Sequence, residues 1–564
     1  MPKSVCVTLA LIASLVIGHV LSGWLVLLLL RLDTGHLAWN TYYTYIAALG
    51  HPQVAALATR IGLAGVLGFG LPLALLITVG YAGWRRGRRQ ALHGDARFAT
   101  GSELARHGLF KKTSDSLVVG SHRGRLLRLS GQQFAILAAP TRSGKGVGVV
   151  IPNLLEYGES MVVLDIKQEN FDLTSGWRAS QGQEVYLFNP FAEDRRTHRW
   201  NPLRYVSEDP SFRISDLLSI SAMLYPDGGD DQKFWVSQSR NAFLAITLYL
   251  FENRDNEYRM GFPREKDAPT LGQAFRLACG DGSDLRVFLR KLASRPFVGS
   301  DCRAAFNNLL SQADDTFASI MGTFKEPLNA WINPVLDAAT SDDDFLLTDL
   351  RRKKMTIYVG IQPDKLAESR LIINLFFSQL INLNTRQLPD SNPELKHQVL
   401  LLMDEFTSIG KVEIIASAVS YMAGYNVRLL PIIQSMAQLD ATYGKDVSRT
   451  ILTNHALQIL YAPREQQDAN DYSEMLGYTT LRRKNVTQGR DRSHSFSDER
   501  RALMLPQELK AMGNDTEVFI YEGLPFPVKC RKIRYYKDRY FTSRLLQKID
   551  VPALDITVGD ARPA

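Results

Sequence analysis

The chain has 564 residues and a formal net charge of +8 at pH 7. That length exceeds what a single hydrophobic core supports, so roughly two to four domains are expected. Apolar residues make up 45% of the sequence and charged residues 22%, which excludes a largely disordered protein. The four cysteines lie far apart without C-x-x-C spacing. They indicate neither a zinc site nor a disulfide framework, as is typical of a reducing compartment.

Two long apolar runs open the chain, from Val5 to Leu30 and from Ile61 to Trp84. Each exceeds the roughly 20 residues that cross a bilayer. A signal peptide competes for the first run, but its apolar core is too long and a second run follows. Much of the net charge lies in Arg85, Arg86, Arg88 and Arg89, which places the end of the second run in the cytoplasm by the positive-inside rule. We therefore expect residues 1–90 to form a transmembrane hairpin in a bacterial inner membrane, with both ends and the bulk of the chain cytoplasmic. Ala64 and Gly68 give only a weak helix-packing signal and are interpreted as ordinary membrane sequence.

A polar stretch, interpreted as a linker, runs from Gln90 to Gly131 and leads to the segment Ala139-Pro140-Thr141-Arg142-Ser143-Gly144-Lys145-Gly146. Apolar runs flank this segment, so the expected order is strand, glycine-bearing turn, helix. In such a loop backbone N–H groups and the helix N-terminus bind phosphate, and a lysine reaches the terminal phosphates. Two positions depart from the consensus G-x-x-x-x-G-K-[ST], because Ala139 replaces the first glycine and Gly146 the hydroxyl residue that ligates Mg²⁺. A glycine-rich turn that carries a lysine is the competing interpretation.

The cytoplasmic chain reads as an α/β fold with a parallel sheet. Strands are expected at 134–138, 161–165, 185–188, 355–359, 399–403, 428–433 and 457–461. Pro152 is expected to limit or kink the helix after the phosphate loop. Pro431 is awkward within a central strand and suggests a bulge or a shifted boundary. Between Ser207 and Asp344 helical spacing dominates, which predicts an all-helical insertion. The expected domains are therefore 91–206 and 345–550 for the nucleotide-binding part, 207–344 for the insertion, and a polar tail at 551–564.

The strongest companion to the loop is the run Val399 to Met403, which ends in Asp404 and Glu405. Ligands of parallel sheets bind at the carboxyl ends of the strands, where Lys145, Asp165 and this pair are expected. Asp404 could hold Mg²⁺ and Glu405 could polarise the attacking water, although strands often simply end in solvated acids. Gln434 ends the next strand and could orient water or sense the γ-phosphate.

At this point the sequence resembles a known family. The segment from Ala139 to Leu155, with Val163-Leu164-Asp165-Ile166-Lys167, is similar to the TraG-type coupling ATPases of type IV secretion and conjugation systems. Further matches are Arg199-Trp200-Asn201-Pro202-Leu203, the segment from Met403 to Phe406, and Ile433-Gln434. With the paired N-terminal spans, the resemblance covers nearly the whole chain. That family also accepts a glycine at the position of Gly146.

The resemblance implies a RecA-like P-loop NTPase domain, an all-α domain for substrate recognition, and a homohexamer with ATP at the subunit interfaces. It implies Lys145 as the phosphate lysine within a loop from Thr141 to Val147. Asp404 and Glu405 carry over as the metal and water carboxylates, with Asp404 as the Mg²⁺ ligand, and Gln434 as the sensor. An arginine finger from a neighbouring subunit is expected as well. Arg428 and Arg464 are its candidates.

The C-terminal part is rich in basic residues. Arg482, Arg483, Lys484, Arg490 and Arg492 form one polar loop, and a second basic run from Arg531 to Tyr540 contains three tyrosines. Such runs can bind a nucleic-acid backbone and stack bases. The preferred interpretation of the second run is an edge strand with a solvated basic face.

The leading hypothesis is a membrane-anchored ATPase that recruits cargo to a type IV secretion channel and couples ATP hydrolysis to its transfer. The expected partners are the inner-membrane components of that system and either a DNA–relaxase complex or protein effectors. Two alternatives stay open. One is an FtsK-like DNA translocase, which the two spans and the helical insertion disfavour. The other is an adaptor in which ATP binding gates assembly, an interpretation that Gly146 keeps open.

Overall fold

A computed structural model describes residues 3–87, 92–227, 229–262, 268–487, 493–556 of the chain. It divides into two compact units, residues 1–93 with 482–498, and residues 94–481 with 499–564. Arg88, Arg89, Arg490, Arg492 and the end of the polar tail, which carried sequence-based expectations, lie outside the described residues.

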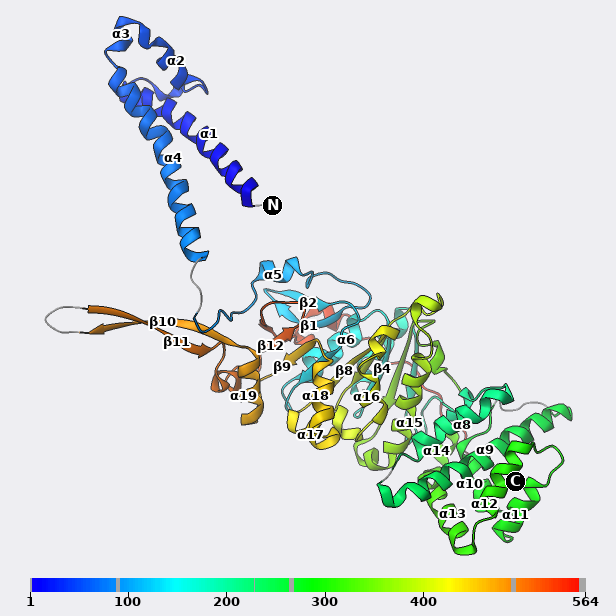
Figure 1. The fold of residues 1–564 in the computed structure, drawn as a ribbon. Helices are drawn as coiled ribbons and strands as arrows, with labels where there is room; N and C mark the ends of the chain where they lie inside the picture. Colours follow the sequence, from blue (N-terminus) through cyan, green and yellow to red (C-terminus); the bar gives the residue numbers. More distant parts are fainter. Residues whose placement is uncertain (1–2, 88–91, 228, 263–267, 488–492, 557–564) are drawn as a thin grey trace. The chain divides into compact units, whose positions relative to one another are not determined.

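The larger unit is built on one sheet of eleven strands (Figure 1). Its parallel part consists, in spatial order, of β9 (Leu457–Leu460), β3 (Ala135–Ala138), β8 (Val427–Ile433), β7 (Val399–Met403), β4 (Ser160–Asp165), β6 (Met355–Gly360) and β5 (Glu184–Phe188). An antiparallel extension continues from β9 through β12 (Thr516–Tyr521), β13 (Val528–Arg531), β1 (Leu117–His122) and β2 (Arg125–Leu129). Every strand expected from the sequence is present.

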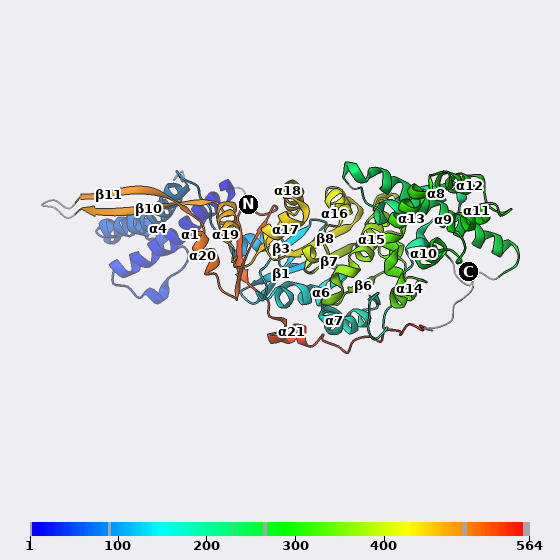
Figure 2. The ribbon, with the colours of Figure 1, turned by 90° about the horizontal axis from the view of Figure 1, so that it is seen from below.

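Helices cover both faces of the parallel strands, which are apolar throughout because both faces are buried. In β7, Leu400 and Leu402 pack on the side of α6 (Ile151–Glu156) and α7 (Glu169–Ser180). The alternate residues, such as Leu401, pack on the side of α15 (Leu366–Asn384). Figure 2 shows α6 and α7 on one side of the sheet and α16 (Glu413–Ala418) and α17 (Met436–Tyr443) on the other. The α/β fold class is confirmed.

The helices of this unit that lie outside residues 207–344 and are not yet named are short. They are α5 (Gly101–Arg106), α18 (Lys445–Thr453), α19 (Gln466–Met475), α20 (Pro506–Lys510) and α21 (Arg539–Thr542). A separate two-stranded ribbon is formed by β10 (Tyr478–Thr487) and β11 (Ser493–Ala502).

Pro431 causes no bulge, contrary to expectation. The pairing of β8 with β7 runs in register through Pro431, which lies opposite Met403. On the other side, β8 pairs with β3 at Ile432 and Ile433, immediately after the proline. The missing N–H therefore falls where the ladder with β3 begins, and the strand tolerates it.

The interpretation of residues 90–131 as a linker was wrong. This segment contains β1 and β2, joined by Arg123 and Gly124, which both have positive φ, 51° and 80°. Two central residues of that kind match the twist of an antiparallel hairpin. The basic run at 531 is not an edge strand either, because β13 lies between β1 and β12.

The smaller unit contains the paired apolar helices α1 (Lys3–Leu29) and α4 (Ala58–Gly87), connected through α2 (Thr41–Ala47) and α3 (Pro52–Ala55). Each is long and apolar enough to cross a membrane, over Thr8–Leu29 and Ala58–Ala82. Ala64 and Gly68, interpreted from the sequence as ordinary membrane sequence, do lie where the two helices pack. A Cβ on Gly68 would lie 2.6 Å from the Ser22 backbone, and Ala64 is fully buried. Small residues let the two helix backbones approach closely.

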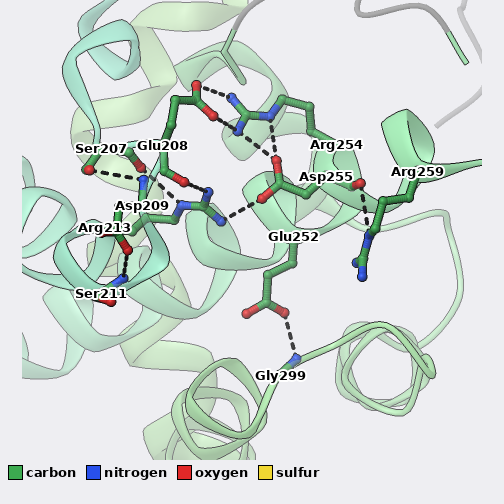
Figure 3. A network of polar contacts seen from close by, with 10 residues as sticks. All are labelled: Ser207, Glu208, Asp209, Ser211, Arg213, Glu252, Arg254, Asp255, Arg259 and Gly299. Atoms are coloured by element: carbon green, nitrogen blue, oxygen red, sulfur yellow. Dashed lines mark hydrogen bonds and ion pairs between the residues drawn. The ribbon is translucent and has the colours of Figure 1, made fainter. Parts of the chain in front are cut away.

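The described part of residues 207–344 contains helices and no strand. These are α8 (Pro210–Leu224), α9 (Lys233–Arg259), α10 (Leu271–Cys279), α11 (Leu285–Ala293), α12 (Ser300–Leu310), α13 (Asp314–Leu328) and α14 (Pro334–Ala339). Figure 3 shows a charged network that ties α8 to α9, in which buried Arg213 pairs with Asp255 at 2.9 Å and Arg254 bridges Asp255 and Glu208. A cavity of about 540 Å³ opens beside this network.

Candidate nucleotide-binding site

The phosphate loop leaves β3 and enters a helix at Gly146. Within it, Arg142 and Gly144 adopt positive φ values of 62° and 88°. Left-handed residues that alternate with right-handed ones turn successive backbone N–H groups toward a common point, which makes an anion-binding concavity. Thr141 and Arg142 are exposed, and the residues from Ser143 to Val147 are partly buried. The expected geometry of strand, loop and helix is present.

The helix begins with a widened π turn, Gly146–Val150, and continues as α6. Pro152 stands in the first turn of α6, where its missing N–H and its ring are tolerated because the preceding turn is wide. The glycines differ in their surroundings. A Cβ on Gly148 would lie 2.4 Å from the hydroxyl oxygen of Tyr461, whereas nothing lies within 4 Å of one on Gly146.

Lys145 reaches across the edge of the sheet to the carboxylates that follow β7. Its Nζ lies 3.4 Å from Asp404 Oδ1 and donates a short hydrogen bond to Glu405 Oε1. Gln434 donates to Glu405 Oε2 at 2.8 Å and accepts from the Thr141 hydroxyl at 3.0 Å. The fold thus brings together Lys145, Asp404, Glu405, Gln434 and the loop, which lie far apart in the sequence.

The two carboxylates have different environments. Burial raises the pKa of Asp404, and the charge of Glu405 raises it further. The charge of Lys145 lowers this pKa but does not outweigh the other two effects. Burial also acts to raise the pKa of Glu405, but hydrogen bonds from Lys145 and Gln434 outweigh it and lower that pKa. Glu405 has a positive φ of 58°, a rare conformation for a glutamate that is found at functional sites. Glu405 is thus held ionised beside the loop.

The residues present fit a magnesium–nucleotide site. Asp404 Oδ1 is buried and, among the described residues, accepts no hydrogen bond of good geometry, while the Lys145 ammonium faces it at 3.4 Å, so this oxygen already lies where positive charge is stabilised. The Ser143 hydroxyl in the loop is similarly buried without a hydrogen-bond partner among those residues. Mg²⁺ typically uses one or two carboxylates together with phosphate oxygens, which needs no larger cluster of acids. Asp404 would hold the ion, and Ser143 supplies a hydroxyl within the loop.

Asp165 lies at the same edge of the sheet, as expected, but is engaged elsewhere. Its Oδ2 accepts the backbone N–H of Phe171 at 2.8 Å, at the start of α7. Burial raises its pKa to about 7. Its role in this structure is to satisfy the first turn of α7.

The two candidate arginine fingers differ. Arg428 is fully buried and donates to the backbone carbonyls of Gln133 and Asp115 at 2.7 and 2.9 Å, so it cannot extend into a neighbouring subunit. Arg464 is exposed and donates to the carbonyl of Thr141 in its own phosphate loop at 3.0 Å.

Two further basic residues near the loop were not assigned from the sequence. Lys532 is buried, and its Nζ donates to the Ser143 carbonyl at 3.2 Å. Lys167, exposed after β4, contributes to the lowered pKa of Glu405 through its charge. The VLDIK segment that contains Lys167 carried a signal in the sequence. No local pattern distinguished Lys532 from its basic neighbours.

Comparison with known proteins agrees with this geometry. Residues 94–554 match the family described as "Type IV secretory system Conjugative DNA transfer". The chain belongs to this family. Within it, Protein VirD4 of Rhizobium radiobacter is 30% identical over 469 residues, which cover 80% of this chain and 65% of the relative. The chain thus spans slightly less than two thirds of that relative. The conjugal transfer protein TraG of Escherichia coli is 26% identical over 551 residues, which cover 87% and 83% of the two chains. The resemblance stated from the sequence is confirmed.

Solved structures share the fold. The bacterial conjugative coupling protein TrwBdeltaN70, in its unbound monoclinic form, is similar with a TM-score of 0.56 and 17% identity, over 79% of this chain and 93% of that one. TrwB in complex with ADP and Mg²⁺ gives a TM-score of 0.54 and 18% identity, over 79% and 95%. The expected RecA-like domain with its helical insertion is therefore the fold of this member of the family.

Proposed function

We propose that this protein is a membrane-anchored ATPase that couples ATP hydrolysis to the transfer of cargo through a type IV secretion system. The observation that carries the proposal is the cluster of Lys145, Glu405 and Gln434 at the phosphate loop of a chain in the conjugative DNA transfer family. Relatives named VirD4 and TraG, and the TrwB complex with ADP and Mg²⁺, support it.

In this proposal each side chain has one task. Lys145 exchanges its carboxylate contacts for the terminal phosphates of ATP. Glu405, whose lowered pKa keeps it ionised, accepts a proton from the attacking water, and Gln434 orients that water. Asp404 would hold Mg²⁺, and the ion would supply positive charge that stabilises the phosphates. The loop N–H groups bind the phosphates, so bound nucleotide and reacting water meet beside one carboxylate.

The proposed location is the bacterial inner membrane, with α1 and α4 as two spans. Large apolar side chains on both helices are exposed, for example Leu15 at 62% and Val66 at 72%, as contact with lipid requires. We further propose a homohexamer with nucleotide between subunits. An arginine finger from a neighbour belongs to that proposal, with Arg428 excluded by its burial.

The helical insertion is the proposed cargo-binding part, for a DNA–relaxase complex or protein effectors. It carries the cavity beside α8 and α9, lined by acidic and basic side chains.

The adaptor alternative makes a different prediction from the motor, because an adaptor requires ATP binding and no turnover. An FtsK-like translocase would move duplex DNA without needing the insertion.

One experiment separates these functions. Glu405→Gln in the full-length protein should retain ATP binding and reduce ATP turnover by about 10²- to 10⁴-fold, the range for loss of a general base. Cargo transfer should fall with it. The matched control is Glu413→Gln, an exposed glutamate paired with Lys411, which should change neither. Transfer that persists without turnover would establish the adaptor, and unchanged turnover would refute the motor.

A deletion tests the insertion. The chain that enters the insertion and the chain that leaves it lie side by side, because Asp344 N donates to the Arg199 carbonyl at 3.0 Å and the Arg204 side chain lies 3.9 Å from Asp343 Oδ2. Replacing residues 207–342 by a short glycine linker is therefore geometrically permitted. The variant should bind ATP and lose cargo recruitment. Retained recruitment would contradict the proposed role of the insertion.

A further inference from the structure

Two basic side chains donate hydrogen bonds to carbonyl oxygens of the phosphate loop. We propose that Lys532 and Arg464 are positioning residues that hold this loop in its phosphate-binding conformation by bonding two of its carbonyl oxygens. The inference rests on the proposed function, because it assigns a means of supporting the same nucleotide site. It also gives Arg464 a role within its own subunit.

The contacts alternate along the loop. Arg464 donates to the carbonyl of Thr141 at 3.0 Å, and Lys532 donates to the carbonyl of Ser143 at 3.2 Å. The residue after each of these carbonyls, Arg142 and Gly144, has positive φ. Each cation therefore bonds the peptide unit that leads into a left-handed residue.

The direction of a peptide unit explains the consequence. In a trans peptide the C=O and the following N–H point in nearly opposite directions, because the unit is planar. When the Ser143 carbonyl points outward to Lys532, the N–H of Gly144 points to the opposite side, toward the concavity. The same relation couples Arg464 and the N–H of Arg142. Both cations thus favour the orientation in which the loop N–H groups face phosphate.

A left-handed conformation at Arg142 costs free energy for a residue with a side chain. The loop consensus normally begins with a glycine, and here Ala139 stands in that position. External hydrogen bonds to the loop carbonyls supply a constraint that does not depend on that first glycine. Charged donors form the stronger class of hydrogen bonds, so two such contacts suit this task.

Lys532 is buried, and its neighbours fix the position of its ammonium group. Only 8% of the residue is exposed, and its Nζ lies 3.5 Å from the centroid of the Tyr461 ring. Tyr461 is itself fixed, because its N–H donates to the Ala138 carbonyl at the end of β3. Burial lowers the pKa of Lys532 to about 8, and Glu517 on β12, itself fully buried, acts against this shift. A buried ammonium requires such partners, and these direct it to the loop.

The two residues follow strands on the side of β3 that leads to the antiparallel extension. Arg464 lies just after β9, and Lys532 immediately follows β13. The phosphate loop is therefore joined to the C-terminal strands through side chains, in addition to the backbone pairing of β3 with β9. A shift of β13 relative to β3 would change the orientation of the Ser143 peptide.

The test measures nucleotide affinity with full-length protein in detergent, using a fluorescent ADP derivative and Mg²⁺. Lys532→Met should raise the Kd about tenfold or more, and Lys532→Arg should restore most of the affinity, because it returns a cationic donor. Arg464→Ala should raise the Kd about two- to fivefold, because an exposed pair contributes less than a buried one. Lys529→Met is the matched control, an exposed lysine on β13 that should leave the Kd unchanged.

Hydrogen exchange on the same proteins supplies a second measurement. Exchange of the peptide that covers residues 139–146 should accelerate in Lys532→Met and in Arg464→Ala, with β6 unchanged. Unaltered affinity in Lys532→Met, or affinity lost equally in its methionine and arginine variants, would overturn the role of Lys532. Arg464→Ala tests the idea independently, since its exposed side chain supports no core, and unaltered loop exchange there overturns its part. Failure of the proposed function looks different, because Lys145→Ala would then bind nucleotide like the wild type.

Discussion

The guanidinium of Arg199 donates to Asp344 at 2.8 Å across a sequence separation of 145 residues. The same arginine pairs with Asp342 at 2.8 Å, and its own backbone N–H donates to Asp344 Oδ2. Arg199 precedes the helical insertion and Asp344 ends it. The Arg-Trp-Asn-Pro-Leu segment, identified in the sequence only by resemblance, is therefore the junction that fixes the insertion to the sheet domain.

Arg199→Ala should loosen this junction. The substitution removes two ion pairs that are only partly screened by solvent, and it leaves the carboxylates of Asp342 and Asp344 without their shared cation. We expect a loss of about 1–2 kcal/mol in the free energy of unfolding. Hydrogen exchange should rise first at the ends of the insertion, within 200–206 and 340–347.

Arg276→Ala is the control for that measurement, because its ion pair with Asp337 lies inside the insertion and its side chain is more exposed. It should change stability by less than about 0.5 kcal/mol. Equal hydrogen exchange at the junction in both variants would contradict the assignment of Arg199 as the residue that fixes the insertion to the sheet domain.

Asp343, between these two aspartates, predicts a pH dependence of stability. Burial raises its pKa to about 7, with Asp342 and Asp344 adding repulsion, while a backbone hydrogen bond and Arg204 act against the shift. The folded state therefore binds this proton more tightly than the unfolded state, whose aspartate pKa is about 3.9. Its stabilising contribution is complete below about pH 4 and is lost as the pH rises toward 7.

Asp343→Asn should remove that dependence. Its amide oxygen can still accept the backbone N–H of Asn201, now 3.0 Å from Asp343 Oδ1, without a charge to bury. The variant should be more stable than the wild type at pH 8, by up to about 4 kcal/mol for a shift of this size, and should match it near pH 4. Apparent Tm values at both pH values, taken at low ionic strength, check this. A constant difference at the two pH values would exclude titration as its cause.

The sequence predicted the strands of the parallel sheet and the residues at their carboxyl ends because those signals are local. Val399 to Met403 is apolar on both faces, and the chain changes abruptly to Asp404 and Glu405. An apolar strand that ends in two acids at a sheet edge is recognisable without tertiary information. The structure then brings Glu405 to Lys145 and Gln434, as the shared edge requires.

Long-range packing decides what the sequence could not predict. Lys532 belongs to a run of basic residues that resembles a solvated strand, and it is buried only because β13 lies between β1 and β12. Strand β1, which lies between β2 and β13, was missed for a related reason, since its apolar run from Leu117 to Val119 is short. Its burial depends on partners more than 400 residues away, such as Arg531 opposite Ser121.

Gly146 allows a gain-of-ligand prediction. A Cβ at this position meets nothing within 4 Å, so crowding does not require a glycine there. Gly146→Thr should fit and return the hydroxyl that the loop consensus places on Mg²⁺. We expect the Mg²⁺ concentration for half-maximal nucleotide binding to fall about fivefold, which corresponds to one added interaction of about 1 kcal/mol. Gly146→Val, which has the same shape without the hydroxyl, is the control. Equal responses to Thr and Val would show that the hydroxyl makes no contact with the ion.

Gly148, two residues further on, should behave in the opposite way. A Cβ there would lie 2.4 Å from the Tyr461 hydroxyl oxygen, and the next nearest atom is 3.5 Å away, an ordinary contact. Gly148→Ala should therefore destabilise the protein by about 1–3 kcal/mol through overpacking, and it should weaken nucleotide binding by displacing Tyr461 or the first helical turn.

Removal of the hydroxyl should relieve this clash. In Gly148→Ala combined with Tyr461→Phe, most of the lost stability and affinity should return, so the two substitutions are expected to be strongly non-additive in a double-mutant cycle. Tyr461→Phe alone supplies the baseline and keeps the ring beneath Lys532. Apparent Tm and nucleotide Kd are measured for all four proteins. Additive effects would mean that Gly148 is required for the widened turn itself and that its contact with Tyr461 is incidental.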